Sequence, residues 1–172
     1  MIARIMQLFP TPPRPPTRLF PEFVKKLPAL TGKTIVITGA NSGIGLETGR
    51  ELARGGATVV MACRDLARAK AARADIAASV PGAKLELVSL DLASLASVRA
   101  CADTIKNQWP RIDVLINNAG LFPFKKQLTD DGFEMQFGVN HLAHFLLTQS
   151  LMPALLAAGR PRVVNVASMM HH

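Results

Sequence analysis

Short apolar runs alternate with longer stretches of helical periodicity from residue 34 to the end of the chain. The runs are rich in β-branched residues and have the length of strands that are buried on both faces. They predict five strands, at Thr34–Thr38, Thr58–Ala62, Lys84–Ser89, Val114–Asn117 and Arg162–Val166. The stretches between them predict helices, at Gly43–Arg54, Asp65–Ser79, Ser94–Gln108 and, as one long helix or two in series, Gly132–Leu156.

Glycine, proline and capping residues mark the boundaries between these elements. Gly55 and Gly56 end the first helix, Pro81 ends the second, and Asp65 is placed to cap the start of the second. Strict alternation of helices with apolar strands predicts a parallel sheet that is covered on both faces. Right-handed crossovers then favour an α/β fold, a Rossmann-type doubly wound sheet of five strands in the order 3-2-1-4-5.

The first 30 residues differ in composition from the rest. Seven of the 12 prolines lie here, and proline fixes its backbone torsion and lacks an amide donor. We therefore predict a Pro-rich basic arm over residues 1–30 and a single domain over residues 31–172. The apolar, acid-poor stretch Met1–Phe9 is also typical of organelle-targeting peptides. Contact of the arm with a membrane surface and mitochondrial targeting are both open at this point.

The formal net charge of +8 raises the question of nucleic-acid binding. Six of the 20 lysines and arginines, but only one of the 12 acidic residues, lie in residues 1–33, so most of the excess belongs to the arm. Aromatic residues, on which nucleotides stack, make up 5% of the chain. We therefore predict no nucleic-acid partner. Two cysteines, Cys63 and Cys101, indicate reduced thiols of an intracellular protein, cytoplasmic or membrane-associated.

The junction between the first strand and the first helix is rich in glycine and reads Thr38-Gly39-Ala40-Asn41-Ser42-Gly43-Ile44-Gly45. Glycines permit a tight turn and let backbone amides approach a pyrophosphate, and the helix start adds unpaired N–H groups and a positive dipole end. Its position after the first strand of an alternating chain predicts a dinucleotide site. The spacing, Gly-xxx-Gly-x-Gly, differs from the common Gly-x-Gly-xx-Gly.

The end of the second strand predicts which dinucleotide binds, because in this fold it faces the adenosine ribose. An acidic residue there would accept from the 2′-hydroxyl of NAD(H), whereas an arginine can pair with the 2′-phosphate of NADP(H). Arg64 lies at this point and favours NADP(H). Asp65 follows it directly, which keeps NAD(H) as the less favoured alternative.

Five segments resemble successive motifs of the short-chain dehydrogenase/reductase family, in their order and at suitable spacing. They are Thr38–Gly45, Asp91–Leu92, Asn117–Gly120, Val139–Thr148 and Arg162–Ser168. Within that family the chain is most similar to the retinol dehydrogenase-like branch, through Asp65, Asp91–Ser94, Gly132–Glu134 and Ser168–His172. The resemblance runs from about residue 30 to the last residue.

The resemblance implies a role for each residue at a matching position. Residues of the glycine-rich loop would hold the pyrophosphate and ribose: Gly39, Asn41, Ser42, Gly43, Ile44 and Gly45. Asp91 and Leu92 would contact the adenine ring. The adenosine side would be lined, and the central sheet stabilised, by Asn117, Ala119 and Gly120. Asn140 would hold a water of the family's proton relay, and Ser168 would hydrogen-bond the substrate carbonyl.

The family moves a proton to or from the substrate oxygen with a tyrosine, assisted by a lysine four residues later. This motif would lie a dozen or more residues beyond Ser168, whereas the chain has four more residues and contains no tyrosine. We therefore expect most of a cofactor site, part of a catalytic site and a fold whose C-terminal part is missing. The chain as given is expected to show no dehydrogenase activity.

The resemblance implies an NADP(H)-dependent oxidoreductase that acts on lipophilic alcohols or carbonyls such as retinoids or steroids. The alternative is a non-catalytic fragment that binds a cofactor or a partner protein. The apolar helix Gly132–Leu156 would lose a packing partner, so we expect it to be a surface for an oligomer. His141 and His144 are three residues apart on this helix, and helix packing is favoured over a metal site because no further ligand is near.

Overall fold

The computed structural model describes residues 29–167. Nearly all of the predicted arm over residues 1–30, and Ser168 of the predicted catalytic site, therefore lie outside the described residues. None of the helices between residues 29 and 167 is long and apolar enough to cross a membrane.

Within the described residues, five parallel strands form one sheet in the order β3-β2-β1-β4-β5, as predicted. The strands are β1 (Thr34–Thr38), β2 (Thr58–Cys63), β3 (Lys84–Ser89), β4 (Val114–Asn117) and β5 (Arg162–Asn165). β2 is one residue longer than predicted and β5 one residue shorter. Because the strands are parallel, their carboxyl ends meet at one edge of the sheet, where ligands bind in open α/β folds.

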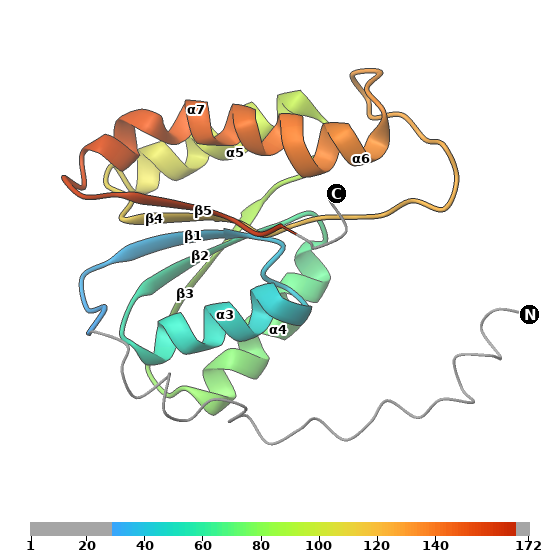
Figure 1. Cartoon of the computed structure of the whole chain (residues 1–172). Helices are drawn as coiled ribbons and strands as arrows, with labels where there is room; N and C mark the ends of the chain where they lie inside the picture. The colour runs from blue at the N-terminus through green and yellow to red at the C-terminus, as the bar shows by residue number, and fades with distance from the viewer. Residues whose placement is uncertain (1–28, 168–172) are drawn as a thin grey trace, which may run out of the picture.

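Helices cover both faces of the sheet (Figure 1). On one face lie α3 (Gly43–Arg54) and α4 (Leu66–Ser79), and on the other lie α5 (Leu95–Gln108) and α7 (Ala143–Leu156). Successive strand residues pack against opposite helix layers. Ile35 and Ile37 of β1 pack towards α3 and α4, whereas Val36 packs towards α5 and α7. The apolar strands thus form two cores, one on each side of the sheet.

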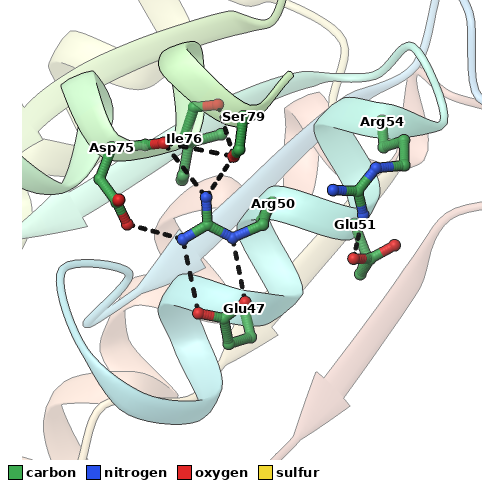
Figure 2. Close-up of polar contacts among 7 residues, drawn as sticks. All are labelled: Glu47, Arg50, Glu51, Arg54, Asp75, Ile76 and Ser79. Carbon is green, nitrogen blue, oxygen red and sulfur yellow. Dashed lines mark hydrogen bonds and ion pairs between the residues drawn. The ribbon is translucent and has the colours of Figure 1, made fainter. Parts of the chain in front are cut away.

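A buried arginine joins α3 to α4 (Figure 2). Arg50 is 3% exposed, and its guanidinium donates to Glu47 of its own helix and to the carboxylate of Asp75 on α4 at 2.7 Å. It also donates to the hydroxyl of Ser79. A buried guanidinium needs such partners, because an unpaired charge would be costly inside the protein. Arg50 therefore ties together the two helices whose N-termini lie at the carboxyl edge of the sheet.

The stretch Gly132–Leu156, predicted as one long helix or two in series, starts later and consists of successive helical segments. Gly132 has a φ of 82° and lies in a turn, so the helical segment begins with the short α6 (Met135–Phe137). A π-helical turn, η1 (Gly138–Leu142), follows before α7. In a π-turn each backbone hydrogen bond spans five residues, and such turns are frequent at functional sites.

The apolar surface of α7 is narrower than the sequence predicts. Leu147, Leu151 and Leu155 are buried in the core beneath the helix. Phe145 and Leu156 are 60% and 66% exposed, and β5 is exposed along its length. Within the described chain, the helix surface left for association is therefore confined to a few side chains.

Candidate functional site

The loop between β1 and α3 needs its glycines for geometric reasons. Gly39 and Gly43 have φ angles of 68° and 55°, in the left-handed region that other residues disfavour. A Cβ on Gly45 would lie 2.5 Å from the carbonyl oxygen of Gly39 and 2.5 Å from the side-chain nitrogen of Asn118. Glycine at these positions therefore lets α3 begin directly against the strand ends.

The first residues of α3 line a cavity of about 460 Å³ at the carboxyl edge of the sheet. Ser42 precedes the helix in an extended conformation, and its side chain makes no capping hydrogen bond. The amides of the first helical turn are thus left to face the cavity with the positive end of the helix dipole, an arrangement that attracts phosphate. The volume lies in the range of about 300–1,000 Å³ that is usual for cofactor clefts.

The part of this cavity next to α4 carries two arginines. Arg64, Asp65 and Arg68 line it where β2 ends and α4 begins. The carboxylate of Asp65 accepts the backbone N–H of Arg68 at 3.0 Å and caps α4, which confirms the predicted cap. Since this bond ties Asp65 to its own helix, the exposed guanidinium groups of Arg64 and Arg68 dominate the charge in this part of the cavity. Sequence reasoning missed Arg68, although its place in the first turn after the cap could have indicated it.

The loop after β3 forms a third part of the cavity wall, with Asp91 and Leu92. The side chain of Asp91 accepts the N–H of Ala93 at 2.9 Å, and the N–H of Asp91 donates to the hydroxyl of Ser97 at 2.9 Å. Leu92 is buried. These contacts fix the loop beside the end of β3 before any ligand binds.

Thr38, at the end of β1, holds the loop that follows β4. Its hydroxyl oxygen accepts the backbone N–H groups of Asn118 and Ala119, each at 2.9 Å. Its carbonyl oxygen accepts the side-chain amide of Asn118, also at 2.9 Å. Thr38 is fully buried, so these bonds lie in the interior and bring Ala119 and Gly120 to the cavity wall.

A second cavity of about 1,230 Å³ lies on the β5 side of the same loop, and Asn117 and Asn140 line it. The side-chain nitrogen of Asn117 donates to Thr148 at 3.1 Å and to Asn165 at 2.8 Å. The side-chain amide of Asn140 bonds both the N–H and the carbonyl of Leu121, each at 2.9 Å. The side chains of both asparagines are therefore engaged in holding the protein itself.

The structure brings ten of the twelve predicted cofactor residues to the first cavity. They are Gly39, Asn41, Ser42, Ile44, Gly45, Arg64, Asp91, Leu92, Ala119 and Gly120. Gly43 shapes the turn without lining the cavity, and Asn117 lies at the second cavity instead of the first. Of the two predicted catalytic residues, Asn140 lies at the second cavity and Ser168 lies outside the described residues.

Residues 33–172 match the sequence model of the short chain dehydrogenase family. The chain belongs to this family. Human retinol dehydrogenase 13 is 47% identical to it over 142 residues, which cover 83% of this chain and 43% of the relative. Mouse retinol dehydrogenase 14 is 50% identical over 150 residues, which cover 81% of this chain and 45% of the relative. The predicted retinol dehydrogenase-like branch is therefore confirmed, and the chain spans less than half the length of these relatives.

Solved structures agree with the fold of this short-chain dehydrogenase chain. A protein from Mycobacterium paratuberculosis matches with a TM-score of 0.73 and 48% identity, over 86% of this chain and 50% of the other. A metagenomic short-chain oxidoreductase, solved in complex with NADP, matches with a TM-score of 0.72 and 33% identity, over 82% of this chain and 64% of the other.

His144 of this short-chain dehydrogenase chain is a buried polar residue for which the sequence predicted only a packing role in a helix. His144 is 5% exposed. Its Nε2 lies 2.9 Å from the hydroxyl oxygen of Thr38, and its Nδ1 lies 3.2 Å from the carbonyl oxygen of Asn140. Burial lowers the pKa of His144 below its ordinary value, and the carbonyl of Asn140 opposes this effect only in part. The imidazole is therefore neutral at physiological pH.

Both cysteines are buried free thiols. Cys63 also lines the first cavity. Burial raises the pKa of Cys63, against the opposing effect of the nearby backbone amides of Ala40 and Asn41. Burial, together with the effect of Cys63, raises the pKa of Cys101 to about 12. Both thiols are therefore protonated and unreactive at neutral pH.

Proposed function

We propose that this chain forms the NADP(H)-binding part of a retinol dehydrogenase-like oxidoreductase. The observation that carries the proposal is one cavity that is lined both by the start of α3 and by two arginines, Arg64 and Arg68. These groups match the diphosphate and the 2′-phosphate, the charged parts of NADP(H). When bound, the nicotinamide of the cofactor would supply or accept a hydride.

Different residues of the cavity would bind different parts of NADP(H). Amides at the start of α3 would hold the diphosphate, since Gly39 and Gly45 let the helix begin directly against the strand ends. Arg64 and Arg68 would pair with the 2′-phosphate through charge-assisted hydrogen bonds. Asp65 would remain on its own helix as a cap, so NAD(H) would lose the acidic partner that its 2′-hydroxyl uses in this fold.

We propose lipophilic alcohols and carbonyls as the substrate class of the enzyme to which this chain corresponds. The names of the curated relatives support a retinoid-like compound. The second cavity supports an apolar one, because its lining includes Leu121, Phe122, Phe145, Val163 and Val166.

A second candidate is a chain that binds NADP(H) without turnover. It is favoured by the absence of tyrosine from all 172 residues, since general acid–base help of the kind that the family takes from tyrosine contributes about 10²–10⁴-fold to a rate. We therefore propose that these residues alone do not reduce retinal with NADPH. Turnover by the purified chain, followed as NADPH absorbance, would contradict this.

Calorimetric titration of the purified chain with NADPH and NADH tests the cofactor assignment. We expect NADPH to bind at least about 10-fold more tightly, which corresponds to about 1.4 kcal/mol. Arg64→Ala and Arg68→Ala should each reduce this ratio by weakening NADPH alone. Arg73→Ala is the matched control, because Arg73 is exposed on α4 and outside the cavity lining. Equal affinities of the wild-type chain for the two cofactors would overturn the assignment.

A further inference from the structure

A frame of hydrogen bonds surrounds the loop over residues 118–121, which lines both cavities. Thr38 holds the beginning of this loop through the N–H groups of Asn118 and Ala119. Asn140 holds its end through both backbone groups of Leu121. His144 bonds both Thr38 and Asn140, since one ring nitrogen faces the Thr38 hydroxyl and the other faces the Asn140 carbonyl.

The donors and acceptors of this frame can be assigned by counting lone pairs. The hydroxyl oxygen of Thr38 accepts two backbone N–H groups at 2.9 Å, which uses both of its lone pairs. Its hydrogen is then left to donate to Nε2 of His144. Nε2 is therefore an acceptor, and the ring proton lies on Nδ1, where the carbonyl of Asn140 accepts it. The frame fits one of the two neutral tautomers.

We infer that His144 is a positioning residue that works as its neutral Nδ1–H tautomer and holds the π-turn against the carboxyl ends of β1 and β4. This inference rests on the proposed function, because the loop that the frame holds is the wall shared by the proposed NADP(H) cavity and the second cavity. Asn140 lies in the π-turn η1 and His144 lies in the first turn of α7, four residues further along the chain.

Protonation of His144 would break the frame. A second ring hydrogen on Nε2 would face a hydroxyl oxygen whose lone pairs are already occupied. His144 bonds the Thr38 hydroxyl and the Asn140 carbonyl through its ring, and its backbone carbonyl accepts the Thr148 hydroxyl. Among the residues that line the second cavity with His144, His141 is the other titratable group, and it is exposed and stacked on Phe137. The burial that lowers the pKa of His144 keeps the imidazole neutral, as the frame requires.

Nitrogen-15 NMR of the histidine rings, recorded on the cofactor-free full chain at neutral pH, tests the tautomer directly. We expect one buried histidine with a proton on Nδ1 and none on Nε2, and Thr38→Ser, which keeps the hydroxyl, should preserve this signature. In Thr38→Val the fixed preference should be lost. A proton on Nε2, or an exchanging mixture of tautomers in the wild-type chain, would overturn the inference. This measurement does not depend on whether NADP(H) binds.

Affinity for NADP⁺ separates positioning from a merely structural role. We expect His144→Leu and Thr38→Val to weaken binding about 10-fold in samples whose circular dichroism shows the folded state, with Thr38→Ser within about 2-fold of wild type. Thr104→Val is the matched control, because Thr104 is exposed on α5 and bonds the Ala100 carbonyl of its own helix. Unchanged affinity in a folded His144→Leu chain would overturn the inference. Absence of NADP⁺ binding to the wild-type chain would refute the proposed function. The NMR measurement of the His144 tautomer would still test the hydrogen-bond frame by itself.

Discussion

The two ends of β1 are tied to their surroundings by different chemistry. At the amino end, the carboxylate of Asp113 is bonded by Lys33 at 2.8 Å and by Arg111 at 3.2 Å. At the carboxyl end, the neutral groups of Thr38 and His144 make the corresponding ties. The end away from the two described cavities uses ion pairs, whereas the end that carries the candidate site keeps its buried groups neutral and leaves its charges facing the cavity.

The two ends should therefore respond to pH in different ranges. Burial alone would raise the pKa of Asp113, but the bonds from Lys33, the Thr34 amide and Arg111 outweigh it and lower that pKa below 3.8. Burial instead lowers the pKa of His144 below 6.5. As the pH falls, protonation therefore destabilises the carboxyl end first, through His144. It destabilises the amino end only in strong acid, through Asp113.

Thr38→Val should have the largest effect on stability. The change keeps the shape of the side chain but leaves the N–H groups of Asn118 and Ala119 without an acceptor. Since each buried unsatisfied donor costs about 1–3 kcal/mol, we expect a loss of about 3 kcal/mol in the free energy of unfolding, measured with urea. The exposed control Thr104→Val should stay within about 0.5 kcal/mol of wild type. A similarly small change for Thr38→Val would show that the carboxyl end is not held by this hydroxyl.

Asp113→Asn should be the next most costly change. Its amide can still accept the N–H of Thr34, but the charged partners Lys33 and Arg111 lose their carboxylate. Because both cations are partly exposed and can be solvated, we expect a loss of about 2 kcal/mol at pH 7. Since the pKa of Asp113 is lowered in the folded state, its contribution is complete above about pH 4 and is lost as the pH falls through the folded value. The difference between variant and wild type should shrink when urea unfolding is repeated at pH 3, and a constant difference would argue against the ion pairs.

His144→Gln should alter the pH dependence of stability more than its value at pH 7.5. The unfolded chain takes up a proton at His144 below about pH 6.5, whereas the folded chain, in which the pKa of His144 is lower, stays unprotonated there until the pH falls further. Wild-type stability should therefore fall between pH 6.5 and pH 5 with a slope of at most about 1.4 kcal/mol per pH unit from this residue. The variant should lack this part of the slope in unfolding measured at pH 7.5 and 5.5. If the stability of wild type and variant changed equally with pH, residues other than His144 would cause the pH dependence.

Gly49→Ala should have the smallest effect, and it should be favourable. Gly49 lies inside α3, and a Cβ there would lie 3.8 Å from Ile37, Val59 and Ile76, which is ordinary contact. We expect a gain of about 0.5–1 kcal/mol from helix propensity, read from the urea midpoint. Gly45→Ala, where the same atom would meet the carbonyl of Gly39 at 2.5 Å, should be destabilising instead.

What the sequence could predict depended on local chemistry. The glycine loop, the cap at Asp65 and the strand order follow from neighbouring residues and from rules of chain connection. The bond between Thr38 and His144 joins residues 106 positions apart, and no pattern in the chain reveals such a contact. The π-turn was missed because its apolar spacing resembles that of an ordinary helix, and Arg68 because exposed arginines are common on helices.

The central claim is that the first cavity holds the diphosphate at α3 and the 2′-phosphate at Arg64 and Arg68. Phosphorus-31 NMR of NADP⁺ tests it most directly, because the two phosphate groups give separate signals. With the folded chain in excess, we expect both signals to move from their free positions. Arg64→Ala and Arg68→Ala should return mainly the 2′-phosphate signal towards its free value. Signals that remain at the free positions in the presence of excess folded chain would overturn this phosphate assignment.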